Sequence, residues 1–178
     1  MQAFELAILN WIQTLRCGVL DVILPAVSWT ADHGEIWILL AIVLIVIPKT
    51  RRIGFAVACG LVLDLLLCNI WLKPMIGRVR PFAIAPSTEL LIKPPHDASF
   101  PSGHTAASFA AVTALAVAGS KLWRPALILA VFISFSRLYL YVHWPSDVLG
   151  GIAVGIFAGW LGAKIAERLM KHLDKKSL

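Results

Sequence analysis

The sequence predicts an all-α, integral membrane helical bundle with about five transmembrane helices, preceded by helices that lie at the membrane interface. Of its 178 residues, 59% are hydrophobic and 15% are charged, and the mean hydropathy is +0.82. A soluble protein of this size could not bury so much apolar surface, so lipid is the expected solvent. The apolar residues also form long runs between short basic segments, a pattern typical of membrane topology. We expect one domain over residues 1–178, because the length fits one and no internal repeat is evident.

Residues 1–32 are expected to form interfacial helices. Over residues 3–15, apolar side chains such as Phe4, Ile8 and Trp11 recur at helical spacing with polar residues between them, which predicts an amphipathic helix. The apolar stretch 19–29 is short for a span and contains a proline, which favours a second interfacial or re-entrant segment. A first transmembrane helix in this region is the alternative interpretation.

The transmembrane core is expected over residues 33–171. Its five apolar segments are 35–47, 53–72, 102–120, 122–142 and 146 to about 169. The first segment is short, which a thin region of bilayer or a few borrowed residues would accommodate. Asp64 and Asn69 lie inside the second segment, where polar groups are expected to face the bundle and hydrogen-bond between helices. Glycines at 150, 151, 155 and 159 give the last helix a smooth stripe for close packing.

The basic residues indicate which way the bundle is oriented. The net charge is +6, but Lys and Arg cluster in short runs between apolar segments, which indicates membrane topology rather than a nucleic-acid partner. Counted through the five spans, ten of them fall on one face and six on the other, and the richer face is expected to be cytoplasmic. The proline-rich loop 73–101 then lies on the outer face. A loop of this length is usually functional or disordered, and we expect an ordered one.

The stretch Pro101-Ser102-Gly103-His104 marks the start of the third span. Phe100-Pro101 favours an extended backbone and Ser102 is a good N-cap, so a helix is expected to begin here. A helix start offers N–H groups without intrahelical partners and a partial positive charge, both of which suit a phosphate. Gly103 lets a ligand approach the backbone, and His104 adds a titratable ring on the first turn.

Two further clusters are predicted to lie on the same face. Lys73, Arg80 and Arg137 can clamp the nonbridging oxygens of a phosphate, and the Ser102 hydroxyl with the amides of the helix start would add donors. Phosphoryl transfer requires mainly this positioning and charge stabilisation from a protein.

The two histidines of these clusters can supply the chemistry. One can attack phosphorus while the other transfers protons. Asp147 follows His143 by four residues and is close enough to accept an imidazole N–H, which would leave the other ring nitrogen free to attack.

Three motifs, in this order and with this spacing, resemble the signature of the type 2 phosphatidic acid phosphatase superfamily of membrane lipid phosphatases. They read Lys73-x6-Arg80-Pro81, Pro101-Ser102-Gly103-His104 and Ser136-Arg137-x5-His143-x3-Asp147. The resemblance implies that His143 is the nucleophile that forms a phosphohistidine and that Asp147 orients it. It implies that His104 is the general acid for the leaving group. The phosphate-binding residues that it implies are Lys73, Arg80, Ser102, Gly103 and Arg137. It also implies that no metal or other cofactor is needed.

Within the superfamily, the sequence looks most like the bacterial undecaprenyl-diphosphate phosphatases. The expected reaction therefore removes the terminal phosphate of undecaprenyl diphosphate, with a membrane lipid phosphate and the bilayer as partners and no nucleic acid. Phosphatidylglycerophosphate, phosphatidic acid and lipid A phosphates are alternative substrates. A phosphotransferase that uses the same site and a non-catalytic lipid-binding or transport protein are alternative functions. The expected location is the bacterial inner membrane, multi-pass, with the site facing the periplasm or exterior. The sequence indicates no oligomeric state.

Several other polar residues have weaker signals. Arg78 and Lys93 are candidates for contacting a second phosphate or a lipid headgroup. His33, His96 and His172 lack motif partners and are expected at the surface, and His96-Asp97 is interpreted as an ordinary loop turn.

Overall fold

The N-terminal helices pack across one end of the molecule. The computed structural model describes residues 2–85 and 89–176, and every regular element within them is a helix. Helix α1 (Gln2–Gln13) and helix α2 (Gly18–Trp29) are bent by 119° relative to each other. The amphipathic α1 turns Glu5, Leu9 and Ile12 toward the protein and leaves Phe4 and Trp11 exposed. Glu5 is one of the polar residues between the apolar side chains of this helix, and its side chain is buried.

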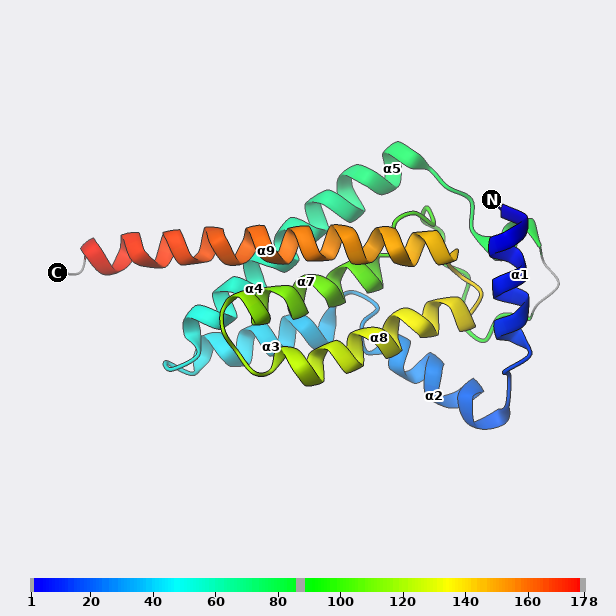
Figure 1. The fold of residues 1–178 in the computed structure, drawn as a ribbon, viewed down its shortest axis with the longest axis horizontal. Helices are drawn as coiled ribbons and strands as arrows, with labels where there is room; N and C mark the ends of the chain where they lie inside the picture. The colour runs from blue at the N-terminus through cyan, green and yellow to red at the C-terminus, as the bar shows by residue number, and fades with distance from the viewer. Residues whose placement is uncertain (1, 86–88, 177–178) are drawn as a thin grey trace.

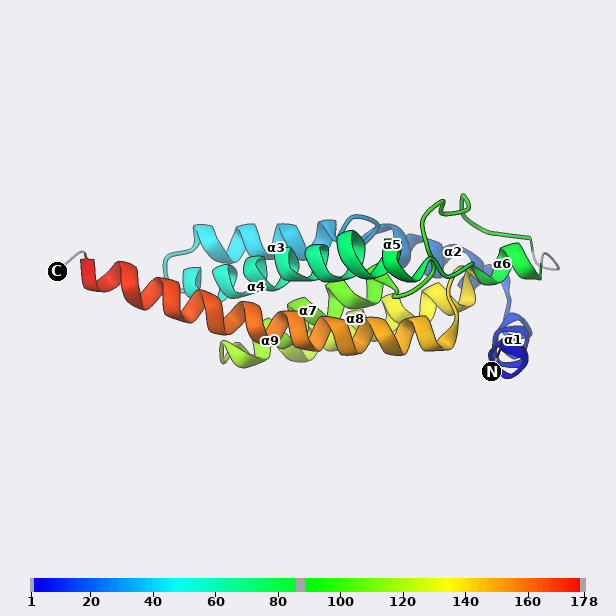
Figure 2. The same cartoon turned by 90° about the horizontal axis from the view of Figure 1, so that it is seen from above.

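The remaining long helices run side by side along the long axis of the molecule (Figure 1). They are α3 (Glu35–Val46), α4 (Arg51–Asp64), the π-helix η1 (Leu65–Leu72), α7 (Gly103–Val117), α8 (Trp123–Tyr139) and α9 (Pro145–Lys176). Helices α3 and α4 form one layer and α7, α8 and α9 form the other (Figure 2). Trp37, Val57, Leu115 and Ile133 are among the buried residues of the apolar core between them.

Helix α9 is held close to α7 by the predicted glycine stripe. A Cβ at Gly155 would collide with the carbonyl oxygen of Ala106, and a Cβ at Gly159 would collide with that of Ala110. The expectation of close helix packing is therefore confirmed. This contact fixes the start of α9 against the start of α7, where the Ser102 amide donates to the Asp147 carbonyl oxygen at 3.0 Å.

The helices differ in their capacity to cross a bilayer. Among the described residues, two segments are long and apolar enough, Arg51–Ile84 and Pro145–His172, and a third is added if the bent pair α1–α2 is one span. The apolar helix α3 has 12 residues and is about 18 Å long, less than the ~30 Å of a hydrocarbon core. The all-α membrane bundle is thus confirmed, whereas the number of five spans stays a prediction.

The segment expected to be one surface loop contains two short helices, so this part of the prediction was wrong. The helix of the second span continues through η1 into α5 (Lys73–Ile76), and α6 (Pro81–Ile84) follows after Gly77. Gly77 has a φ of 60° and ends α5 in the left-handed conformation that glycine adopts without strain. Because α5 extends the helix by one turn, Lys73 projects from a regular element rather than from a loop.

Candidate active site

The predicted functional residues gather at the end of the bundle where α1, α2 and the segment after η1 meet. A cavity of about 1080 Å³ opens there. Six of the eight predicted site residues line it: Lys73, Arg80, Gly103, His104, Arg137 and His143. The other two, Ser102 and Asp147, have no exposed surface and do not line it, among the residues that the structure describes. Apolar side chains of α3 and α4, including Ile42 and Leu61, form the opposite wall.

His143 lies on the short loop between α8 and α9. Its side chain is buried, and Nε2 lies 3.2 Å from a guanidinium nitrogen of Arg80. The loop needs an unusual backbone at Tyr141, whose φ of 60° is in the left-handed region and whose hydroxyl donates to Asn10 of α1 at 2.9 Å. Pro145 starts α9 as expected, because a proline is favoured in the first turn of a helix.

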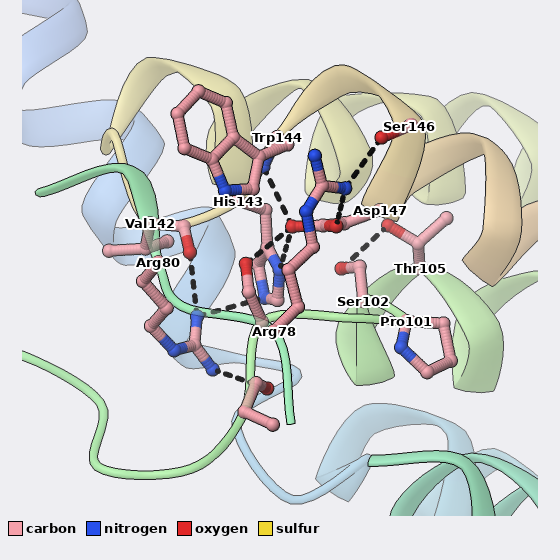
Figure 3. Close-up of polar contacts among 12 residues, drawn as sticks. Arg78, Arg80, Pro101, Ser102, Thr105, Val142, His143, Trp144, Ser146 and Asp147 are labelled. Atoms are coloured by element: carbon pink, nitrogen blue, oxygen red, sulfur yellow. Dashed lines mark hydrogen bonds and ion pairs between the residues drawn. The ribbon is translucent and has the colours of Figure 1, made fainter. Parts of the chain in front are cut away.

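Asp147 lies behind His143 on the first turn of α9 (Figure 3). Its Oδ2 is 3.4 Å from Nδ1 of His143, longer than the usual N–H···O hydrogen bond but within ion-pair distance. Oδ2 also accepts hydrogen bonds from the Trp144 amide at 2.8 Å and from the Ser99 hydroxyl. Burial, together with the positive charge of Arg80, holds the pKa of His143 well below its usual range. The ring is therefore neutral at neutral pH, as a nucleophile requires.

Lys73 and Arg80 share a carboxylate that sequence reasoning treated as part of an ordinary turn. Asp97 forms an ion pair with the Lys73 ammonium and accepts a hydrogen bond from Arg80 at 2.7 Å. Arg80 also donates to the carbonyl oxygens of Asp97 at 2.9 Å and Val142 at 2.7 Å. Burial alone would raise the pKa of Asp97, but the two cations outweigh it and lower the pKa to about 2. An anion therefore already lies at the two cations predicted to bind phosphate.

Arg137 reaches the cavity from the last turn of α8. It is 2% exposed, and one of its terminal nitrogens donates to the Ser28 hydroxyl of α2. Its Nε has no hydrogen-bond acceptor within residues 2–85 and 89–176. A buried donor without an acceptor is rare and costly in proteins. One buried donor of this side chain is therefore left without a partner among the described residues.

His104 stands on the first turn of α7, as the sequence predicted. Its Nε2 lies 3.0 Å from Oδ1 of Asp32, on the turn between α2 and α3. Ser102 is at the N-cap position, but its hydroxyl makes no capping bond; it accepts a hydrogen bond from Thr105 at 3.1 Å. Gly103 packs closely, because a Cβ there would lie 3.1 Å from the Asn69 side-chain oxygen and 3.5 Å from the Lys73 ammonium.

Some of the other polar residues line the cavity, and others contact the site residues from outside it. Lys93 lines the cavity, whereas Arg78 does not and instead contacts Asp147. Asp64 and Asn69 line the cavity, but Oδ1 of the buried Asp64 has no hydrogen-bond partner in the described part of the chain, so the expected interhelical bonding is incomplete. The residues that lack motif partners are exposed as predicted: His33, His96 and His172.

The residues that sequence reasoning missed are carboxylates. Asp32, Asp97 and Glu5 each contact a predicted site residue or its partner, and each lies far from that partner in the chain. A weak signal existed, because these three carboxylates share the predicted outer face with six basic residues, and buried charges of opposite sign tend to pair.

Comparisons with known proteins show which family this chain belongs to. The chain is 35% identical over 131 residues to an undecaprenyl-diphosphatase of Sulfolobus acidocaldarius, a match that covers 73% of this chain and 63% of that protein. It is 32% identical over 161 residues to the undecaprenyl-diphosphatase BcrC of Bacillus subtilis, covering 88% of this chain and 80% of that protein. The crystal structure of Aquifex aeolicus LpxE superposes with a TM-score of 0.79 at 30% identity, covering 89% of this chain and 94% of that one. Residues 51–171, which contain all three motifs, match the family described as the PAP2 superfamily, and the chain belongs to it.

Proposed function

We propose that this chain is a membrane lipid phosphatase that removes the terminal phosphate from a polyprenyl diphosphate, with undecaprenyl diphosphate as the preferred substrate. The observation that carries the proposal is the position of the His143 ring. A neutral imidazole has its Nε2 at the cavity wall beside Arg80, while Asp147 lies behind its other nitrogen. The two relatives named undecaprenyl-diphosphatase support the choice of substrate.

The reaction proceeds through a covalent intermediate in this proposal. Nε2 of His143 attacks the terminal phosphorus, so that an N–P bond forms while the bond from phosphorus to the bridging oxygen breaks. His104, on the cavity wall, gives its proton to that leaving oxygen. Water then attacks the phosphorus of the phosphohistidine with His104 as base, the N–P bond breaks, and inorganic phosphate leaves. Asp147 stabilises the charge on the His143 ring in both steps.

The cavity suits a substrate with a charged head and an apolar tail. Lys73, Arg80 and Arg137 stand at its polar end, where they can neutralise phosphate oxygens without a metal ion. The apolar wall from α3 and α4 continues toward the lipid-facing side chains of these helices, which are exposed, as at Ile42 and Val62. A polyprenyl chain is wholly apolar and fits that wall.

The proposed location is the bacterial inner membrane with the cavity on the exterior face. Its support is the distribution of basic residues, which are fewer on the face that carries the motifs. Attaching a membrane-impermeant thiol label to a cysteine placed at Ser87 tests this orientation. We expect labelling from outside intact cells, and labelling only after permeabilisation would reverse the orientation.

A substrate panel tests the activity. Purified protein in detergent is given undecaprenyl diphosphate, phosphatidylglycerophosphate, phosphatidic acid and a lipid A phosphate, each with a chelator present. We expect phosphate release in chelator, fastest from undecaprenyl diphosphate. Faster release from a glycerolipid would reassign the substrate, and release only after a divalent metal is restored would contradict the metal-free chemistry.

Product analysis separates hydrolysis from phosphoryl transfer. Release of inorganic phosphate that is unchanged by an added alcohol acceptor supports a hydrolase. Transfer of the phosphate to the acceptor would indicate a phosphotransferase. Tight lipid binding without any phosphate release would indicate a binding or transport protein.

A further inference from the structure

Asp147 is held in place from several directions, although it does not reach the cavity. Its Oδ1 accepts a hydrogen bond from Arg78 at 2.6 Å, on the side away from His143, while Oδ2 takes the bonds from Trp144 and Ser99 (Figure 3). The residue has no exposed surface. A buried carboxylate remains ionised only if cations and donors compensate for its lost hydration. Arg78 supplies the cation.

Arg78 is fixed as firmly as the carboxylate that it holds. The nitrogen that bonds Asp147 also donates to the Ser146 hydroxyl at 2.6 Å, and the other terminal nitrogen donates to Oε2 of Glu5 at 2.7 Å. The guanidinium lies 5.3 Å from the centre of the Trp144 ring, within the range of a cation–π contact. The side chain thus has one well-defined position. In that position it serves Asp147 and not the cavity.

Glu5 brings the N-terminal helix into this arrangement. Its side chain is 4% exposed, and its Oε1 accepts a hydrogen bond from the Ser146 amide at 2.9 Å, at the start of α9. Other residues of α1 support the same region: Leu9 packs against Tyr141 and Trp144, and Gln13 donates to the Tyr139 carbonyl oxygen at 2.9 Å. Helix α1 therefore lies along the whole loop that carries His143. Its exposed residues include Phe4 and Trp11, whereas its buried face supports the site.

The charges alternate along this line of contacts: Glu5 is negative, Arg78 positive and Asp147 negative. Removing Arg78 would take away the cation that both buried carboxylates contact, and Oδ1 of Asp147 would lose its partner on the side away from His143. An Asp147 side chain that is no longer held on that side can turn its Oδ2 away from Nδ1 of His143 and then orients the ring less well. Removing the charge of Glu5 would leave Arg78 free to turn away from Asp147. Either change acts on the nucleophile through its partner.

We propose that Arg78 and Glu5 are positioning residues that hold Asp147 aimed at His143, so that helix α1 is part of the catalytic machinery. The inference rests on the proposed function, because it assigns a task within that reaction. It also decides between two tasks for Arg78, since a phosphate contact would require this side chain to reach the cavity. The spacing of 3.4 Å between Asp147 and His143 is expected to shorten when the ring becomes charged in the reaction.

Steady-state and quenched-flow kinetics of purified variants test the assignment. Arg78→Gln is expected to lower kcat for phosphate release by about 10- to 100-fold, the usual loss when a partner that orients a histidine is removed, with little change in KM. Arg78→Lys should recover part of the activity, because its ammonium can still neutralise one carboxylate. Glu5→Gln should lower kcat by about tenfold in the same way. The double variant should be no worse than Arg78→Gln, since both residues act through one contact.

Two variants provide matched controls. Arg124 lies over the Trp123 ring at the far end of the bundle, with its guanidinium 5.7 Å from the ring centre, so Arg124→Gln removes a similar contact away from Asp147. Glu167 pairs with Lys171 on the C-terminal part of α9, so Glu167→Gln removes a carboxylate that also pairs with a cation. Both are expected to keep the unmutated kcat. A thermal unfolding measurement on each variant separates loss of fold from loss of rate, and Arg78→Lys and Glu5→Gln decide the matter if Arg78→Gln fails to fold.

The rate of phosphohistidine formation is the deciding readout. A slower burst of enzyme-bound phosphate in Arg78→Gln and Glu5→Gln supports the positioning role. A raised KM with an unchanged burst rate would make Arg78 a phosphate ligand and overturn the inference. An unchanged kcat in folded variants would overturn it too. If the unmutated protein forms no bound phosphate at all, the proposed function fails rather than this assignment.

Discussion

His143 and His104 face the same cavity from opposite kinds of surroundings. His143 is 1% exposed on a loop that α1, α9 and the segment before Pro81 enclose, and its ring lies between Arg80 and Asp147. His104 stands on the first turn of a long helix with 13% of its side chain exposed, and Asp32 on a neighbouring turn is its polar partner. A nucleophile needs one fixed orientation, whereas a proton donor must reach groups that change during the reaction. The difference in enclosure fits these two tasks.

The polar groups next to Nε2 of the two rings also differ. Arg80 beside Nε2 of His143 disfavours a proton on that ring, which agrees with the lowered pKa of His143. The carboxylate of Asp32 beside Nε2 of His104 can instead accept an N–H from its ring. Substitutions at the two sites should therefore fail in different ways.

The largest effect is expected at His143. His143→Gln should lower phosphate release by at least about 10⁴-fold, because it removes the proposed nucleophile. No enzyme-bound phosphate should be trapped on quenching. His172→Gln, which changes an exposed histidine on the C-terminal part of α9, is the control. Activity above one tenth of the unmutated rate in His143→Gln would refute the nucleophile assignment.

The His104→Gln variant should release phosphate more slowly only from substrates whose leaving group needs a proton. For a lipid diphosphate we expect a loss of about 10²- to 10⁴-fold, the usual contribution of a general acid. For p-nitrophenyl phosphate the loss should be much smaller, because nitrophenolate leaves without protonation. His143→Gln should be equally inactive on both substrates. Equal losses at His104 on both substrates would remove the proposed distinction between the two histidines.

Asp32→Asn tests whether the partner of His104 matters. We expect kcat to fall by about tenfold with KM unchanged, as for other partners that orient a histidine. The matched control is Glu35→Gln, because Glu35 pairs with the exposed His33 at 3.4 Å in the same region. Kinetics of release from a lipid diphosphate provide the measurement. A control variant that loses as much as Asp32→Asn would assign the effect to the turn rather than to the contact.

The smallest effect is expected at Asp97, in front of His143. Asp97→Asn frees Lys73 and Arg80, so inorganic phosphate should inhibit about two- to fivefold more strongly, the size expected for half-exposed ion pairs. With the pKa of Asp97 at about 2, the inhibition constants of both proteins should keep the same ratio between about pH 5 and pH 8. Weaker inhibition of Asp97→Asn would show that Asp97 orders the two cations instead of competing with phosphate.

The same substitution makes a prediction for stability. A carboxylate whose pKa is lowered by folding stabilises the folded state above its unfolded pKa, and this contribution is lost as the pH falls through the folded value. The difference in melting temperature between the unmutated protein and Asp97→Asn should therefore be constant above about pH 4 and disappear as the pH falls toward about 2. His96→Gln, next along the chain and exposed, is the control.

The amino-acid sequence by itself determined the class of fold and six of the residues that line the cavity. Apolar runs predict membrane helices without knowledge of the neighbours, because each segment must satisfy its own backbone hydrogen bonds in lipid. The glycine stripe of α9 predicted a close helix contact, and the contact with α7 confirmed it. The spacing of His143 and Asp147 is local, so their approach could also be read from the chain.

The tertiary structure alone decided which carboxylates serve which cations and rings. Glu5 meets Arg78 across 73 positions and Asp32 meets His104 across 72, and no periodicity connects residues so far apart. The described parts of the segment, 77–85 and 89–101, are mostly irregular, so the sequence did not indicate that Asp97 would contact Lys73 and Arg80. It also did not indicate that Arg78 and Arg80, two positions apart, would reach opposite sides of His143. Such contacts follow from packing helices whose faces are set by burial. Burial also makes them matter, because a charge removed from water must find its partner wherever the fold provides one.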